Sequence, residues 1–379
     1  MRIGIDATPL PPNPLGAGTY IIQLTRALTE LHTDEQWVIF AQRSGRAKIE
    51  TPAMTNVEWV LIPDISPSSR LVWEQSRLPF LARRSRIDIL HSLHYTRPWV
   101  LPYASSIVTF HDMTFLLYPE LHTLAKRILF PLAIQMSARR AQAIITVSEH
   151  TRKDTLRLLN LPEERVITTS LAASPDYRPI SDALLLENCK RKYNLPDSFI
   201  LYVGPVEPRK NLPLLLKAYH RLAVDGLNAS LVIVGALGWM YAEVMQQVNA
   251  LNLSSKVHFL GYIPAEDLPM VYNLARVFVY PSLYEGFGLP PLEAMACGTP
   301  VITSAVSAMI ETVGEAGILV NPQGAEGLVD AIRVVCEDDE LHQQLSQKGR
   351  AQAAKFTWKH TAQETLRVYQ KVWNARQRL

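Results

Sequence analysis

The stretch Pro281–Glu293 reads PSLYEGFGLPPLE and follows Val277–Tyr280, an apolar run of β-branched and aromatic residues. Such a run predicts a buried strand. Gly286 and Gly288 predict a turn, and the two prolines after them suit the first turn of a helix, where a missing N–H has no intrahelical partner anyway. The stretch therefore predicts a strand, a turn and a helix, which is the repeating unit of a parallel α/β sheet.

Two carboxylates bracket the turn and bear on what it binds. Ligands of parallel α/β sheets bind beyond the carboxyl ends of the strands, and free amides at a helix N-terminus attract phosphate. Glu285 and Glu293 would repel a phosphate, but carboxylates are good acceptors for sugar hydroxyls. The stretch thus fits a ligand with both a phosphate and a polyol; the alternative is a loop with two solvated glutamates.

Strand and helix patterns alternate in two series along the chain. The first series occupies residues 1–173 and the second residues 199–357, and between them residues 174–198 gather Pro, Ser and Asp and predict a linker. Two such series imply two doubly wound parallel sheets, an α/β fold of two domains. Residues 358–379 have helical apolar spacing and predict a terminal helix.

Composition excludes several classes of protein. No run approaches 18 apolar residues, so we expect no transmembrane helix, and the N-terminus lacks the apolar core of a signal peptide. The three dispersed cysteines fit a reducing cytosol. Residues 1–172 hold 19 Lys and Arg against 15 Asp and Glu. This excess suits an anionic membrane surface or a lipid-diphosphate acceptor, and equally a solvated basic surface. Without a basic stripe with interleaved aromatics, we expect no nucleic-acid partner.

Three further places have residues suited to a ligand site. Arg209 and Lys210 lie at a predicted helix start, where cations oppose the helix dipole unless an anion lies between them and the amides. His111 ends a predicted strand, where a histidine can reach a ligand, although a core histidine is the alternative. Gly16 and Gly18 lie in a predicted loop after the first strand, but GAGTYI does not complete G-x-G-x-x-G.

Glu285 and Glu293, with seven residues between them and GFGLP inside, resemble the E-x7-E signature of retaining GT-B glycosyltransferases. The match is closest to glycosyltransferase family 4, the glycosyltransferase group 1 family, and extends over AMACGTPVI (Ala294–Ile302) and VGEAGILVNP (Val313–Pro322). The resemblance implies two Rossmann-like domains facing across a cleft. It also implies that helix 358–379 crosses back to the N-terminal domain; a helix packed on its own domain is the alternative.

The resemblance also implies roles for individual residues. Glu285 would face the sugar near the reacting centre, His111 would touch the donor sugar, and Glu293 would bind the donor ribose. The diphosphate would lie against two cations, two glycines of the first loop and the amides of one turn, namely Arg209, Lys210, Gly16, Gly18, Gly286, Phe287, Gly288 and Leu289. With no D-x-D motif in the chain, we expect no metal and no other cofactor.

The segments TFHDMTFLLYPE and GPVEPRKN look most like mannosyltransferases of surface-polysaccharide assembly. We therefore expect retaining transfer of mannose from GDP-mannose, with UDP-sugars as the second choice of donor. The expected acceptor is a glycan or lipid-linked oligosaccharide, and the expected location is the cytoplasm, with peripheral membrane contact through the N-terminal domain. The alternatives are a nucleotide-sugar epimerase and a non-catalytic sugar-nucleotide-binding subunit; a dehydrogenase is disfavoured by the incomplete G-x-G-x-x-G.

Overall fold

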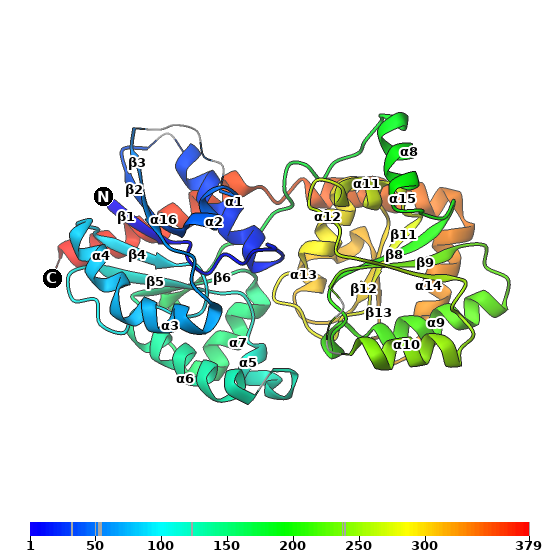
Figure 1. Ribbon diagram of the computed structural model, residues 1–379, viewed down its shortest axis with the longest axis horizontal. Helices are drawn as coiled ribbons and strands as arrows, with labels where there is room; N and C mark the ends of the chain where they lie inside the picture. The colour runs from blue at the N-terminus through cyan, green and yellow to red at the C-terminus, as the bar shows by residue number, and fades with distance from the viewer. Residues whose placement is uncertain are drawn as a thin grey trace. The chain divides into compact units, whose positions relative to one another are not determined.

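The computed structural model describes residues 1–31, 33–49, 51, 55–122, 124–236, 238 and 240–378 (Figure 1). It divides into two compact units. Unit 1 comprises Met1–Leu171 and Thr357–Leu379, and unit 2 comprises Ala172–Phe356. Among the described residues, no helix combines the length and the hydrophobicity needed to cross a membrane.

Unit 1 is built on a seven-stranded sheet in the order β3-β2-β1-β4-β5-β6-β7, in which every pairing is parallel. In Figure 1, α1 and α16 cover one face of this sheet and α3, α6 and α7 cover the other. The elements are β1 Arg2–Asp6, α1 Ala17–Glu30, β2 Gln36–Gln42, α2 Arg43–Arg46, β3 Val57–Ile62, α3 Pro67–Ser76, α4 Leu78–Arg84, β4 Ile89–Ser92, β5 Ser105–Phe110, α5 Thr114–Leu117, α6 Leu124–Arg140, β6 Ala143–Thr146, α7 Glu149–Leu159, β7 Val166–Thr168 and α16 Trp358–Gln377.

Unit 2 has a six-stranded sheet in the order β10-β9-β8-β11-β12-β13, again parallel throughout. The predicted class, two doubly wound α/β sheets, is confirmed. The elements are α8 Ala183–Lys192, β8 Phe199–Val203, the short 3₁₀ turn η3 Pro208–Lys210, α9 Leu212–Val224, β9 Ser230–Val234, α10 Tyr241–Ala250, β10 Val257–Gly261, α11 Leu268–Leu274, β11 Val277–Tyr280, α12 Leu289–Cys297, β12 Val301–Ser304, α13 Met309–Val313, β13 Ile318–Val320, α14 Ala325–Glu337 and α15 Asp339–Ala353.

Residues 174–198, expected to form a linker, lie inside unit 2 and contain α8. The Asp182 side chain caps α8 by accepting from the amides of Leu184 and Leu185. Lys192, at the end of α8, donates to the Asp267 carboxylate at 2.5 Å, and Asp267 precedes α11. The Pro, Ser and Asp content that suggested a linker therefore includes a helix cap and a segment packed on its own unit.

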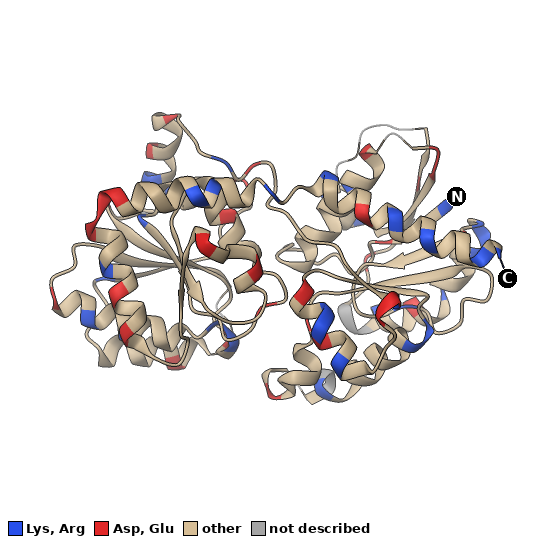
Figure 2. Ribbon diagram, turned by 180° about the vertical axis from the view of Figure 1, so that it is seen from behind, with Lys and Arg blue, Asp and Glu red and all other residues tan. Residues whose placement is uncertain are grey.

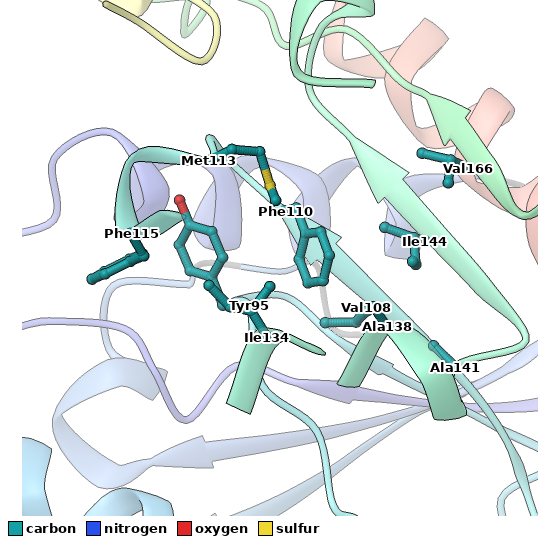
Figure 3. Packing of buried hydrophobic residues seen from close by; sticks show 10 residues of the cluster. All are labelled: Tyr95, Val108, Phe110, Met113, Phe115, Ile134, Ala138, Ala141, Ile144 and Val166. Carbon is teal, nitrogen blue, oxygen red and sulfur yellow. The ribbon is translucent and has the colours of Figure 1, made fainter. Parts of the chain in front are cut away.

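A hydrophobic cluster holds α6 against the sheet of unit 1 (Figure 3). Ile134 and Ala138 of α6 pack with Val108 and Phe110 of β5 and with Ile144 of β6, and all five are fully or almost fully buried. Figure 3 shows these side chains gathered beside the strands, with Tyr95, Met113 and Phe115 toward one end of the cluster. The inner face of α6 is thus fixed by core packing.

The C-terminal helix α16 belongs to unit 1, as predicted, although Leu379 lies outside the described residues. Its Tyr369 is fully buried, with its ring 6.3 Å from that of Trp37 and 5.5 Å from that of His91. The hydroxyl of Tyr369 lies 2.7 Å from Nδ1 of His91, whose Nε2 lies 2.8 Å from Oγ1 of Thr109. Burial lowers the pKa of His91 to about 3, so this ring is a neutral core group.

We expect Tyr369→Ala to lower the free energy of unfolding of unit 1 by about 3–5 kcal/mol, because it removes a buried aromatic ring. Tyr369→Phe keeps the ring but leaves Nδ1 of His91 without its partner, so its expected cost is about 1–3 kcal/mol. Urea unfolding of both variants measures the two effects. Equal costs would contradict the assignment of packing and hydrogen bonding to separate parts of the side chain.

Charges on α15 follow the helix dipole (Figure 2). Asp339 and Glu340 lie in its first turn, Arg350 lies in its last turn, and the Asp338 side chain caps the helix by accepting from the amide of Leu341. Asp338, Asp339 and Glu340 therefore stabilise a helix start, whereas Glu337 is the last residue of α14. In the described part of the chain, no three His, Cys, Asp or Glu side chains are grouped as metal ligands.

Candidate active site

Unit 2 brings the predicted charged residues together where its strand order reverses. The chain runs outward from β8 to β9 and β10 on one side, and β11 begins the other side next to β8. The loops after β8 and β11 therefore leave adjacent strands at the sheet's carboxyl edge, which is where doubly wound sheets bind ligands. Arg209 and Lys210 follow β8, and Glu285 follows β11.

Glu285 is the centre of a buried charge cluster. Its Oε1 accepts from Nζ of Lys210 at 2.6 Å and from the hydroxyls of Ser282 at 2.6 Å and Tyr280 at 3.1 Å. It also forms an ion pair with Nη1 of Arg209 at 2.8 Å. Lys210 also donates to the Tyr280 hydroxyl. The two cations at the start of a helix were expected to need an anion beside them. The structure places the Glu285 carboxylate there, 75 residues from Lys210 in the sequence.

The cluster fixes the protonation of its members. Burial by itself would raise the pKa of Glu285, but Arg209 and Lys210 outweigh it and lower that pKa to about 2. Burial and the neighbouring Arg209 lower the pKa of Lys210, and Glu285 opposes them. Arg209 and Lys210 thus face Glu285, and the nearby Glu207 adds a further negative charge that acts to raise the pKa of Lys210.

The two oxygens of Glu285 differ in what they can do. All the hydrogen bonds that its carboxylate accepts from the described residues go to Oε1, and Oε2 accepts none. The backbone N–H of Glu285 donates to Oγ of Ser307 at 2.9 Å, which fixes the residue from a second side. An anchored carboxylate with one uncommitted oxygen can accept a hydroxyl of a bound ligand at a defined position.

The turn before α12 offers fewer amide donors than its position suggests. Gly288 caps α12 with φ of 99°, and Leu289 is the first helical residue. Pro290 and Pro291 follow and have no N–H, so Leu289 alone supplies an amide among the first three residues of the helix. The side chains of Phe287 and Leu289 are buried, so only the backbone of Phe287 and Leu289 is suited to meet a ligand.

We expect Gly288→Ala to destabilise unit 2 and displace this turn. A Cβ at Gly288 would lie 2.1 Å from Cε of Met309, in a left-handed backbone that alanine adopts poorly. Gly226→Ala is the control, because Gly226 has a similar φ of 88° but a Cβ there meets nothing within 4 Å. Thermal unfolding should show a cost of about 1 kcal/mol for Gly226→Ala and more for Gly288→Ala. Equal costs would contradict the role of Met309.

Glu293 lies inside α12 in an apolar environment. Burial raises its pKa to about 7, although a hydrogen bond from the Tyr272 hydroxyl at 3.2 Å to Oε2 opposes that change. Tyr177 packs edge-on against Tyr272 with ring centroids 5.8 Å apart. Oε1 of Glu293 accepts no hydrogen bond from the described residues, so this carboxyl group can receive donors from a ligand and titrates near neutral pH.

The other predicted residues belong to unit 1, where His111 follows β5 directly. His111 is half-buried, its Nε2 lies 2.9 Å from the carbonyl oxygen of Leu93, and the Tyr20 ring stands edge-on 5.0 Å away. Burial lowers its pKa. Gly16 precedes α1 as expected, whereas Gly18 lies inside the first turn of α1, where a Cβ would be 2.8 Å from Cβ of Pro14. The prediction that Gly18 belongs to a loop was wrong, because α1 already begins at Ala17.

Both halves of the chain match family models. Residues 187–352 match the model "Glycosyl transferases group 1", and residues 15–170 match "Glycosyltransferase Family 4". The O-antigen chain mannosyltransferase B of Escherichia coli is 33% identical to this chain over 97% of its length and 99% of the relative. The chain belongs to the group 1 glycosyltransferases of family 4.

This glycosyltransferase is also similar to the O-antigen chain mannosyltransferase RfbU of Salmonella typhimurium, at 29% identity over 84% of this chain and 86% of that protein. Among solved structures, the sucrose-phosphate synthase of Thermosynechococcus elongatus has a TM-score of 0.78 and 22% identity, with coverage of 99% of this chain and 100% of that one. At this identity the likeness concerns the fold, and the two Rossmann-like units have the GT-B fold.

Sequence reasoning missed several residues of the glycosyltransferase's charge cluster. Tyr280 and Ser282 donate to Glu285, and Ser307 accepts from its amide. The first two flank the end of β11, and polar residues at a strand's carboxyl end are a usable signal. The sequence holds no comparable signal for Ser307. This residue lies in a loop beyond β12, with a φ of 50°, and it reaches Glu285 only through the path of that loop.

Proposed function

We propose that this glycosyltransferase transfers mannose from GDP-mannose, with retention of anomeric configuration, to a glycan or lipid-linked oligosaccharide in surface-polysaccharide synthesis. The buried cluster of Glu285, Arg209 and Lys210 at the switch point of unit 2 carries the donor-binding part of this proposal. The choice of mannose is supported by the full-length similarity to O-antigen chain mannosyltransferase B.

The proposed donor site assigns each group a task that its surroundings permit. Arg209 and Lys210 donate hydrogen bonds to the diphosphate, with the backbone amides of Gly286–Leu289 beside them. Oε2 of Glu285 accepts a hydroxyl of the donor sugar. Glu293, with Oε1 uncommitted, accepts from the ribose. His111, Gly16 and Gly18 are the proposed contributions of unit 1.

The state of Glu285 supports a role in binding rather than nucleophilic attack. A carboxylate whose pKa is about 2, held by two cations and two hydroxyls, is a weak base and a weak nucleophile. We therefore propose attack by the acceptor on the same face that the leaving group departs from. An oxygen of the departing phosphate takes the acceptor's proton, and Arg209 and Lys210 stabilise the charge that develops on the diphosphate.

We propose that transfer needs no metal ion. A diphosphate leaving group requires neutralisation by a metal or by fixed cations and amides, and Arg209 and Lys210 are fixed by hydrogen bonds to Glu285 and its neighbours. We also propose a cytoplasmic location, with an acceptor presented at the membrane surface.

The proposal is tested by thermal shift with GDP, UDP and ADP and by turnover of GDP-mannose with a lipid-linked acceptor, each with and without EDTA. We expect GDP to raise the midpoint without effect of EDTA; a ligand at 100 times its dissociation constant stabilises by about 2.7 kcal/mol. NMR of the product should show the anomeric configuration of the donor. Loss of binding in EDTA overturns metal independence, and inversion overturns the mechanism. Conversion of the sugar nucleotide without acceptor would indicate an epimerase, and donor binding without turnover would indicate a binding subunit.

A further inference from the structure

The turn that follows β4 has an unusual backbone conformation. Tyr95 has a φ of 40°, although its side chain is bulky and this left-handed region favours glycine. The amide of Thr96 donates to the carbonyl oxygen of His94, which makes the turn a tight one. Strained residues of this kind persist only where their surroundings hold them, and they gather at functional sites. The contacts that hold the turn His94–Thr96 therefore indicate its role.

The turn lies at the switch point of unit 1. The strand order β3-β2-β1-β4-β5 places β4 beside β1, although the chain reaches β4 only after β2 and β3. The amide of Tyr95 donates to the carbonyl oxygen of Thr109 in β5 at 2.9 Å, which keeps the turn at the carboxyl edge of the sheet. Doubly wound sheets bind ligands at this edge and at such switch points.

Three side chains of α3 hold the residues at the end of this turn. Nη2 of Arg70 donates to Oγ1 of Thr96 at 3.2 Å, and the same hydroxyl donates to Oε2 of Glu74 at 2.7 Å. Nε2 of Gln75 donates to the carbonyl oxygen of Arg97 at 3.0 Å. Arg70 and Glu74 are paired at 2.7 Å, and the carboxylate is fully buried. Because burying two charges costs much of what their attraction returns, such a pair is better explained by the geometry that it fixes than by stability.

The turn also fixes the proton of His111. Nε2 of His111 lies 2.9 Å from the carbonyl oxygen of Leu93, and the Tyr95 ring stands 5.7 Å from the imidazole. A carbonyl oxygen can only accept, so Nε2 holds the proton, and the neutral ring that burial favours by lowering the pKa leaves Nδ1 as an acceptor. The Tyr95 hydroxyl accepts from the amide of Asp112 at 3.0 Å, which ties the turn to the residue after His111. The imidazole is thus held from two sides.

We propose that Arg70, Glu74 and Thr96 are positioning residues that hold the turn after β4, so that His111 presents the lone pair of Nδ1 to a hydroxyl of the donor sugar. The inference rests on the proposed contact between His111 and the sugar, and it adds the residues and the proton position that this contact requires. A relaxed turn would withdraw the Leu93 carbonyl from Nε2. The ring would then populate the tautomer in which Nδ1 is a donor.

The first test reads the tautomer of His111 in the full chain without any substrate. Nitrogen NMR of protein with isotope-labelled histidine distinguishes a protonated Nε2 from a protonated Nδ1, and the His111 signals are those lost in His111→Gln. We expect a protonated Nε2 in the wild type and in Thr96→Ser, which keeps the hydroxyl, and a mixture of tautomers in Thr96→Val, which loses it. Gln75→Met should act in the same direction. The matched control is Thr155→Val in α7, whose buried hydroxyl donates to the carbonyl oxygen of Thr151 in the same helix.

The second test compares turnover of GDP-mannose with the thermal shift by GDP, which lacks the sugar. Misplacing a contact group by about 1 Å can cost about a hundred-fold in rate, so Thr96→Val should turn over about ten- to a hundred-fold more slowly. Thr96→Ser and Thr155→Val should stay close to the wild type, and the GDP shift should not change in any of them. Because Thr96 acts through His111, the double variant Thr96→Val with His111→Gln should be no slower than His111→Gln alone.

The inference is overturned if Thr96→Val keeps either the tautomer or the turnover of the wild type, or if Thr155→Val changes both equally. It is also overturned if the two losses multiply in the double variant, or if Nδ1 of His111 is protonated in the wild type. Should Thr96→Val unfold, Gln75→Met decides the same comparison, because it loosens the turn from a half-buried position. If GDP does not shift the wild type, the proposed donor site fails, whereas the tautomers of the variants still decide the positioning role.

Discussion

Lys210→Ala should abolish GDP binding and turnover and lower the free energy of unfolding by about 3 kcal/mol. The variant leaves the Glu285 carboxylate buried with Arg209 as its only cation, and removing one member of a buried ion pair typically costs about 3–5 kcal/mol. Arg209 remains 2.8 Å from Oε1 of Glu285 and still compensates part of its charge, so we expect a loss of stability at the lower end of this range. Urea unfolding and calorimetric titration with GDP measure the two effects.

A second substitution separates stability from function at this site. Lys210→Ala with Glu285→Ala removes the stranded carboxylate, so most of the lost stability should return while turnover stays absent. Lys217→Ala, an exposed lysine on α9, is the control and should change stability by less than about 0.5 kcal/mol. Unchanged stability in Lys210→Ala, or restored activity in the double variant, would contradict the proposed cluster.

The stability of unit 2 should fall as pH rises through about 7 because of Glu293. Its pKa is raised from 4.5 to about 7 in the folded state, so the folded protein holds the proton more tightly than the unfolded chain does. The resulting stabilisation is fully present below 4.5 and is lost as pH rises through about 7, by about 3 kcal/mol at most. Glu293→Gln should flatten this part of the stability profile, and the exposed control Glu315→Gln should leave it unchanged.

The same carboxyl group should make nucleotide binding depend on pH in the opposite direction. Ribose hydroxyls donate to the ionised form, so GDP affinity of the wild type should weaken as pH falls below about 7. In Glu293→Gln that dependence should disappear, with weaker binding at about pH 8. Calorimetry at about pH 6 and about pH 8 provides the comparison. A wild-type affinity that is constant between those pH values would exclude Glu293 from the ribose contact.

Local pattern was enough to predict the strands and helices that position the site. Val277–Tyr280 is a strand and Glu293 lies in the helix after Gly288, because apolar runs, glycine and proline act over a few residues. The contacts of Glu285 were beyond such reasoning. Its partners Arg209 and Lys210 come from another strand's loop, and only the order β8-β11 in the sheet makes them neighbours.

The differences between prediction and structure have local physical reasons. Gly18 joined α1 because Gly16 supplies the positive φ that ends the loop, so the helix starts at Ala17. The segment 174–198 gained a helix because Asp182 caps α8 and Lys192 reaches Asp267. In both places, residues that usually interrupt regular structure act as the cap of a helix.

The contribution of α16 to unit 1 has a consequence for synthesis on the ribosome. Tyr369 completes the packing around Trp37 and His91, so unit 1 lacks part of its core until α16 has been translated. Unit 2 is continuous in sequence and leaves the exit tunnel whole before α16 does. Domains ordinarily fold in the order in which they are made. Here unit 1, whose strands are made before unit 2, reaches its native state only after unit 2 has been made.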